Sequence, residues 1–427
     1  MDRIIELIFL ILYGLSYVEP HLKKIRKRIE RFLKPFYKAI LVAINNAIRR
    51  FSRSFMSYDG PLIIIISAAL LLDSILSIAG IGYVYDVYGK TIRIAMICLF
   101  YQAFMKKRFM MITSSTFIIV MFIIISNLYH IVRSNSNYFE YVLLYAIVIL
   151  YSIWYVSEEQ MRWICMIYGI GGMAILAAAK FTDFFRGWES SSISNLAFFS
   201  YTVSVVGCVN ITQRKHKIFF IIYSCIYFVW LEVFNARSSI LCSLILMLCI
   251  LKVIPLKKIL TEKTILIILL TPLIIAVFIV IIHNMPFTDD LNLWSIRHFK
   301  KPIFNGRDTL WEKALIVWRK HCILGDGNPY TAWHNSAVTC LAETGTLGYV
   351  AWIYVIRKWC LKAYRAIDDN ITFGALSSFM IVWLHQSLEQ GLFGVRGSPV
   401  VMFMLGIMLA RVNTLNRGEI IDESNKT

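Results

Sequence analysis

The sequence predicts an all-α protein with about twelve transmembrane helices, and both its composition and its patterning indicate this fold. Of the 427 residues, 58% are hydrophobic and only 16% are charged, whereas soluble domains average about 45–50% apolar and about 25% charged residues. The apolar residues gather in blocks such as 61–80, 111–128 and 263–282. Each block approaches the roughly 20 residues that a helix needs to cross a bilayer, and this pattern excludes a soluble enzyme.

The predicted spans divide the chain into four regions. The spans lie near 61–80, 88–105, 111–132, 138–156, 161–180, 193–211, 216–232, 237–254, 263–283, 335–356, 371–388 and 397–413. Residues 1–60 precede the first span, residues 61–283 hold spans one to nine, residues 284–334 form a long loop, and residues 335–427 hold the last three spans and a tail.

Lysine and arginine in the short loops set the predicted orientation. They concentrate near 106–108, 214–217, 252–263 and 357–365 and are sparse in the alternate loops. Because cytoplasmic loops are enriched in these residues, we predict that the long loop 284–334 faces outward, away from the cytoplasm. The formal net charge of +18 suits an anionic inner leaflet, and no nucleic-acid-binding motif accompanies it.

The first 60 residues differ from the spans. The apolar stretch 4–18 is short for a span, and the segment His21–Arg53 that follows is strongly basic. Its apolar residues recur at three- and four-residue spacing, which predicts an amphipathic helix on anionic lipids of the inner leaflet. An arm that binds a partner protein is the alternative interpretation.

The long loop has a composition typical of an ordered segment. We expect Asp308 to cap a helix that runs to about Leu324. The residues of its predicted apolar face are Leu310, Trp311, Ala314, Leu315, Val317, Trp318 and Cys322. Glycines and a proline then break the chain before His334, at the mouth of the next span.

Ionisable residues at the mouths of spans are the candidate functional residues, because they cost free energy there. The candidates on the predicted outer face are Arg186, Glu232, Arg237, Arg307, His334, Glu389 and Arg396. Arginine donates two parallel hydrogen bonds to phosphate oxygens, so arginines on one face indicate a phosphate or pyrophosphate headgroup. Histidine accepts a proton near neutral pH. An arginine that snorkels to the interface and a structural histidine remain the alternatives.

Short motifs follow one another through this region. They are Gly306-Arg307 with Leu310-Trp311, the glycine pair Gly325 and Gly327, the pair His334-Asn335, and Glu343-x-Gly345-x-x-Gly348. Arg237 lies in an Ala-Arg-Ser-Ser run at the start of a span. In this order, the motifs over about residues 193–356 resemble the O-antigen ligase / Wzy polymerase superfamily, and topology alone extends the likeness to the first five spans.

The resemblance implies an integral membrane glycosyltransferase of the GT-C type, in the cytoplasmic (inner) membrane of a bacterium, with its active site on the extracytoplasmic side. The enzyme would be inverting, would use no metal or cofactor, and would take its donor glycan from undecaprenyl pyrophosphate. By the same likeness, His334 would be the general base, and Arg237 and Arg307 would bind the pyrophosphate. Asn335 and Glu343 would have supporting or orienting roles, and Arg186 would bind a sugar.

Within this family, two activities compete. A polymerase joins lipid-linked repeat units into O-antigen, capsular polysaccharide or exopolysaccharide, with a flippase and a chain-length regulator as partners. A ligase moves the finished glycan onto the lipid A core of lipopolysaccharide, or onto protein. The outer loop 284–334 is smaller than expected for a ligase, and this favours the polymerase. A lipid-linked oligosaccharide flippase fits less well, because transporters usually have two similar halves and the sequence contains no such repeat.

Overall fold

The computed structural model describes part of the chain. The described residues are 158–181, 190–207, 214–233, 236–299, 302–304, 306–327, 333–389 and 399–424. They belong to the second of two compact units, Met1–Pro61 and Leu62–Thr427. The predictions for residues 1–60, for the four spans within 61–156, and for Arg186 and Arg396 lie outside the described residues.

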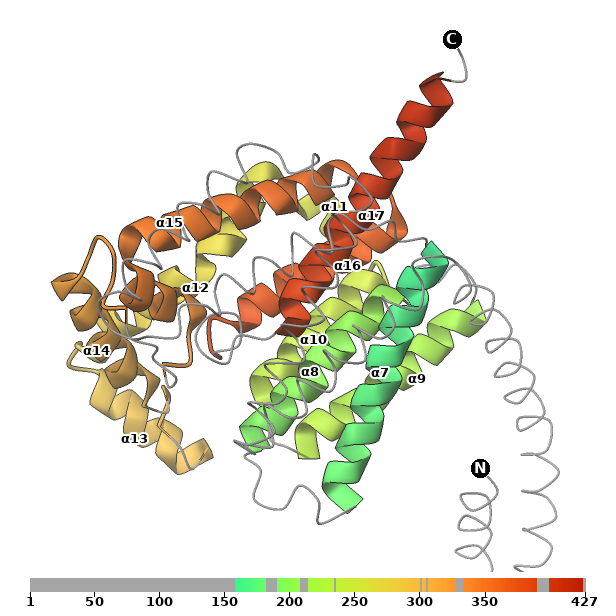
Figure 1. Cartoon of the computed structure of the whole chain (residues 1–427). Coiled ribbons are helices and arrows are strands. Elements are labelled where there is room, and N and C mark those ends of the chain that lie inside the picture. Colours follow the sequence, from blue (N-terminus) through green and yellow to red (C-terminus); the bar gives the residue numbers. More distant parts are fainter. Residues whose placement is uncertain are drawn as a thin grey trace, which may run out of the picture. The chain divides into compact units, whose positions relative to one another are not determined.

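The described residues form helices and no strand, which confirms the all-α class. The helices are α7 Glu158–Phe181, α8 Ser190–Gly207, α9 Arg214–Val233, α10 Arg237–Ile250, α11 Leu256–Ile259, α12 Glu262–His283, α13 Thr288–Phe299, α14 Arg307–Lys320, α15 Ser336–Arg365, α16 Asn370–His385 and α17 Pro399–Ser424. Figure 1 shows α7, α8, α9 and α10 side by side, with α16 next to α10.

Every predicted span from 161–180 onward coincides with one of these helices. By length and composition, however, α12 is the one helix in the described part of the chain that could cross a membrane by itself. Helices α10 and α16 are apolar but have 14 and 16 residues, and an α-helix rises only about 1.5 Å per residue.

Small residues allow close packing between α7 and α8. A side chain added at Gly172 would place its Cβ 2.3 Å from Ser200, and one at Gly169 would meet Ser204 at 2.7 Å. Such small residues let the backbones of the two helices approach closely.

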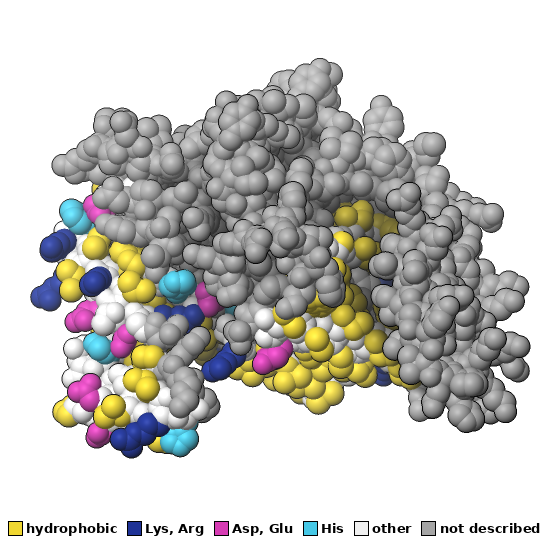
Figure 2. Space-filling model, turned by 90° about the horizontal axis from the view of Figure 1, so that it is seen from below, with side chains coloured by type: hydrophobic (Ala, Val, Ile, Leu, Met, Phe, Trp, Pro, Cys, Tyr) yellow, Lys and Arg dark blue, Asp and Glu magenta, His cyan; other side chains and the backbone are white. Residues whose placement is uncertain are grey.

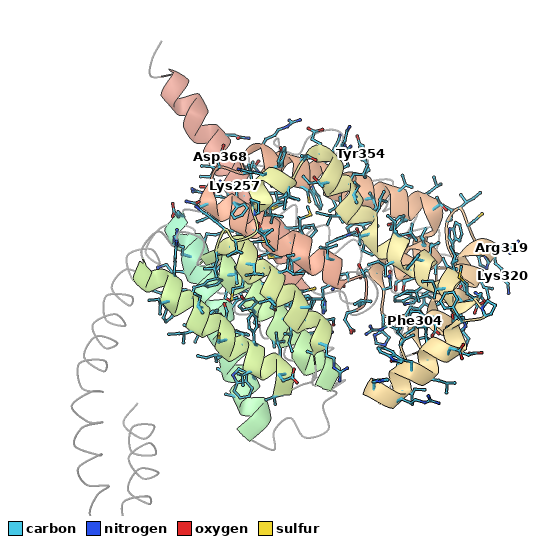
Figure 3. The ribbon with its side chains drawn as sticks, turned by 180° about the vertical axis from the view of Figure 1, so that it is seen from behind. Lys257, Phe304, Arg319, Lys320, Tyr354 and Asp368 are labelled. Atoms are coloured by element: carbon cyan, nitrogen blue, oxygen red, sulfur yellow. The ribbon has the colours of Figure 1, made fainter. Side chains whose placement is uncertain are left out.

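Polar contacts identify the helix ends that lie together. At one end, Arg411 of α17 pairs with Asp369 at the start of α16, and Arg162 of α7 donates to the carbonyl of Gly207 at the end of α8. Lys257 Nζ lies 3.6 Å from Asp368 Oδ1 at the same end, and Figure 3 shows these two far from Arg319 and Lys320. We name this the Asp369 end; its loops are those with the predicted cytoplasmic lysines and arginines.

The other end, the His334 end, is where α10 and α15 begin and α16 finishes. Here Ser239 Oγ of α10 lies 3.0 Å from His385 Nε2 of α16. The backbone N–H of Ser336 donates to the carbonyl of Gln386. Helices α10, α15 and α16 therefore bring together residues that are far apart in the sequence.

The long loop 284–334 contains two helices, where the sequence analysis predicted one. Helix α14 confirms the predicted helix in part, with Trp311 and Ala314 buried and Lys313, Arg319 and Lys320 exposed. It ends at Lys320 instead of near Leu324, and Cys322 of the predicted apolar face lies beyond it and is exposed. Helix α13 was not predicted, although two aspartates in its first turn and Arg297 and His298 in its last suit the helix dipole. Figure 2 shows charged and histidine side chains over α13 and α14, beside a continuous hydrophobic surface of the neighbouring helices.

The predicted cap of α14 was wrong. The N-cap residue is Gly306, with a φ of 78° and no side-chain cap hydrogen bond. Asp308 lies inside the first turn and is buried, and its Oδ2 is 2.8 Å from His283 Nδ1 at the end of α12. The Asp308 carboxylate therefore pairs with α12 and does not cap α14, as its position in the sequence had suggested.

Helix α15 is not the continuous span that was predicted at 335–356. It is broken at Gly345, which has a φ of 70° and a ψ of −174°. The loop after α14 fills the break: the Gly327 N–H donates to the Glu343 carbonyl, and the Thr346 and Leu347 N–H groups donate to Cys322 and Ile323. The interrupted helix hydrogen bonds are thus replaced, as expected for buried backbone groups.

Candidate functional site

Asn335 fixes the start of α15. Its Oδ1 accepts hydrogen bonds from the backbone N–H groups of Ala337 and Val338 at 2.9 and 3.1 Å. Its Nδ2 donates to the carbonyls of Pro272 in α12 and Ser387 after α16, both at 2.9 Å. An asparagine side chain offers two donors and an acceptor with two lone pairs, so this buried residue is fully satisfied and joins three segments.

A second pair of bonds ties α15 to the end of α16. Ser336 Oγ donates to Gln386 Oε1 at 2.9 Å, and the Ser336 backbone N–H donates to the Gln386 carbonyl at 3.1 Å. All of these groups are buried. Buried hydrogen bonds therefore join the segment that carries His334 to the one that carries Glu389.

His334 takes an uncommon backbone conformation beside this clamp. Its φ is 48°, a region that residues other than glycine rarely enter and that often marks a functional position. Its side chain is 45% exposed, and its Nδ1 lies 3.4 Å from Glu389 Oε2. The imidazole is thus oriented by a carboxylate on one side and still accessible to a ligand.

Arg307 reaches the same carboxylate from α14. Its Nη2 donates to Glu389 Oε1 at 2.7 Å, and the two side chains are 23% and 16% exposed. Gly306 precedes Arg307 in the left-handed region, which glycine adopts without steric cost. The turn at Gly306 therefore places the first residue of α14 over the end of α16.

The Glu389 carboxyl group is held in its ionised form. Burial raises its pKa, but the His334 hydrogen bond and the positive charge of Arg307 outweigh burial, so the pKa lies below its ordinary value. An ionised carboxylate is only an acceptor. A neutral imidazole that donates its Nδ1–H to this carboxylate has Nε2 free of hydrogen, so that Nε2 is the proton acceptor of that tautomer.

The structure brings together two of the three principal predicted residues, Arg307 and His334, on one carboxylate. Arg237 is the first residue of α10 and is exposed. In the described part of the chain, no ion pair or hydrogen bond links Arg237 to Glu389. It lies two residues before Ser239, which contacts His385, and His385 is one helical turn before Glu389. Arg237 is thus at the same end of the helices.

The glycine motifs join the loop after α14 to the break in α15. Any side chain at Gly325 would meet the Glu343 carbonyl oxygen at 2.3 Å, and one at Gly345 would meet the Ile323 oxygen at 2.2 Å. Glu343 is buried next to this crossing, a position that supports a structural or orienting role. The two glycine motifs are therefore one tertiary contact between the loop and α15.

Sequence reasoning recognised Glu389 as an outer ionisable residue but gave it no role. The carboxylate is 82 residues from Arg307 in the sequence, and no local spacing signals that pairing. His385 and Ser239 were also missed, because a histidine and a serine in apolar helices have no periodic signature.

In the described residues, no group of three or more His, Cys, Asp or Glu side chains is placed to hold a metal ion. Comparisons with protein-family models, with curated proteins and with solved structures find no match to this chain. The resemblance of its motifs to the O-antigen ligase / Wzy polymerase superfamily therefore stays a prediction.

Proposed function

We propose that the protein is a membrane glycosyltransferase that polymerises oligosaccharide repeat units linked to undecaprenyl pyrophosphate. The observation that carries this proposal is the convergence of Arg307 and His334 on Glu389 at one end of the helices. The arrangement combines a cation for a phosphate group with an oriented base, and both are partly exposed. A packing contact alone would not require a strained, accessible histidine.

In the proposed reaction His334 is the general base, and the arginines bind the leaving group. His334 Nε2 takes the proton from an acceptor sugar hydroxyl, and the oxygen attacks the anomeric carbon of the donor. The bond from that carbon to the pyrophosphate oxygen breaks, and its electron pair leaves with undecaprenyl pyrophosphate. Arg307, with Arg237 nearby, stabilises the charge that develops on the leaving group. Attack from the face opposite the leaving group inverts the anomeric centre.

The proposal includes a twelve-span topology with the His334 end on the outer face of the cytoplasmic membrane. The basic loops at the Asp369 end support this orientation, because such loops stay cytoplasmic. Substituted-cysteine labelling in a cysteine-free background tests it, with Asp289→Cys and Asp368→Cys, both at exposed residues. A membrane-impermeant maleimide should label intact cells at position 289 and only lysed cells at position 368. The reverse pattern would refute the orientation.

The activity itself is tested with the purified full chain in nanodiscs and a lipid-linked repeat unit. We expect chains of two or more repeats to form with the wild type and not with Arg307→Ala. Gel analysis of surface glycan after deletion separates the two family activities. Single repeats mark a lost polymerase, whereas accumulated lipid-linked long chains would identify a ligase instead.

A further inference from the structure

The carboxylate of Glu389 occupies the position where a phosphate oxygen would bind Arg307. The contact runs from Arg307 Nη2 to Glu389 Oε1 at 2.7 Å, which is a normal length for a charge-assisted hydrogen bond. A carboxylate and a phosphate present similar acceptor oxygens to a guanidinium. The two groups would therefore compete for the same donor.

The contact with Glu389 uses only part of the hydrogen-bonding capacity of the Arg307 guanidinium. In the described part of the chain, Arg307 meets Glu389 through one nitrogen and one oxygen. Arg411, by contrast, holds Asp369 with two parallel contacts, Nε to Oδ2 at 3.2 Å and Nη2 to Oδ1 at 2.7 Å. A guanidinium has five N–H donors in a fixed fork, so a single contact can be exchanged for another anion at modest cost.

Charge makes the exchange necessary when a pyrophosphate arrives. A carboxylate a few ångströms from a multiply charged phosphate is repelled strongly where water is partly excluded. The second oxygen of Glu389 already lies 3.4 Å from His334 Nδ1. Glu389 therefore keeps a partner, His334, when its contact with Arg307 is lost.

We propose that Glu389 is an internal anion that occupies Arg307 in the free protein, is displaced by the pyrophosphate of the donor, and then serves only His334. Displacement couples donor binding to activation of the base, because Glu389 is released toward the Nδ1–H of the imidazole. The His334 proton acceptor is thus best oriented when the leaving group is in place. This inference rests on the proposed function and adds a positioning role for Glu389.

The test measures ligand binding separately from turnover. The full chain in nanodiscs is titrated with inorganic pyrophosphate and with undecaprenyl pyrophosphate, using the wild type and Glu389→Gln. Glutamine keeps the size of the side chain and removes its charge. We expect Glu389→Gln to bind both ligands on the order of tenfold more tightly, because the competing anion is lost, while kcat for chain extension falls.

Asp289→Asn is the matched control, since it removes one negative charge at an exposed residue of α13, in the loop that also carries Arg307. It should leave the affinity for both ligands within about twofold of the wild type, as expected for a screened surface charge. A gain equal to that of Glu389→Gln would show a general charge effect and would overturn the proposal.

A double-mutant cycle with Arg307→Ala locates the competition. The gain from Glu389→Gln should disappear in the Arg307→Ala background, because a coupled pair gives a non-additive effect. Unchanged or weaker binding by Glu389→Gln, with normal binding by the wild type, would overturn the displacement and leave the proposed function standing. Failure of the wild type to bind either ligand would instead overturn both. If Glu389→Gln bound inorganic pyrophosphate more tightly than the wild type but not undecaprenyl pyrophosphate, the carboxylate would compete with free pyrophosphate only. That result would overturn displacement by the donor.

Discussion

Two clusters of ionisable side chains lie at opposite ends of the described helices, and they use similar residues differently. At the Asp369 end, Arg411 holds Asp369 by two contacts, and Asp369 Oδ2 also accepts from the N–H and hydroxyl of Thr372 as the cap of α16. At the His334 end, Arg307 holds Glu389 by one contact, and the histidine is 45% exposed. A cluster whose hydrogen-bonding groups are mostly paired stabilises the fold, whereas one with donors left over can bind a ligand.

The proposed difference between the two ends is tested most directly by removing the exposed histidine. We expect His334→Ala to lower chain extension by about 10²–10⁴-fold, the usual contribution of general acid–base catalysis. Membrane abundance and thermal stability should stay near those of the wild type, because the clamp around Asn335 does not use the imidazole. Gel analysis of the glycan with immunoblotting of the protein measures both. Full-length polymer in this variant would exclude the general-base role.

The backbone that supports the His334 end is tested at the break in α15. Gly345→Ala should destabilise the protein by more than the about 1–3 kcal/mol of a strained backbone alone, since the added Cβ would lie 2.2 Å from the Ile323 oxygen. Gly306→Ala is the control: its φ of 78° is also positive, but nothing lies within 4 Å. Thermal unfolding in detergent should show the larger shift for Gly345→Ala. Equal shifts would mean that the crossing of the loop and α15 adds nothing.

The two arginines are compared by the same conservative change. Arg307→Lys should lower chain extension by about 10–100-fold, because the planar fork that matches phosphate is lost, and the unfolding temperature should change little. Arg411→Lys should do the reverse, with a lower unfolding temperature and near-normal turnover per folded molecule. Parallel assays of turnover and unfolding measure both variants. Similar losses of turnover in the two would remove the distinction between the ends.

The smallest expected effect concerns the charge at the Asp369 end. Burial raises the pKa of the Asp369 carboxyl, but Arg411 and Thr372 outweigh burial and hold it below its ordinary value. The pair therefore stabilises the fold above the unfolded pKa of about 3.9, and this stability is lost as the pH falls through the folded pKa. Asp369→Asn should cost about 1–2 kcal/mol near pH 7, because asparagine still caps the helix.

Unfolding measured at pH 7 and below pH 4 checks this prediction. The difference between Asp369→Asn and the wild type should shrink as the pH falls through the folded pKa of Asp369, because the folded aspartate becomes protonated only there. A difference that grows on acidification would contradict the assigned sign, and a large loss of turnover per folded molecule would give the Asp369 end a role beyond stability.

Much of the fold could be predicted, because local sequence encodes it. Apolar blocks of span length fixed the positions of α7 to α10, α12 and α15 to α17, and the three- to four-residue spacing of Trp311, Ala314 and Trp318 located α14. The cap at Asp308 and the continuity of α15 could not be predicted. Both depend on partners from distant segments, His283 in one case and the loop at Cys322 in the other.

The sequence by itself identified the candidate functional residues at this end of the protein, because charge is costly beside apolar spans and so is conspicuous there. It named Arg237, Arg307 and His334 from residue type, order and topology. Tertiary structure alone decided that Glu389 lies between Arg307 and His334, because α14, α15 and the end of α16 meet only when the chain folds. Pairing across 82 residues depends on packing, and no periodicity records it.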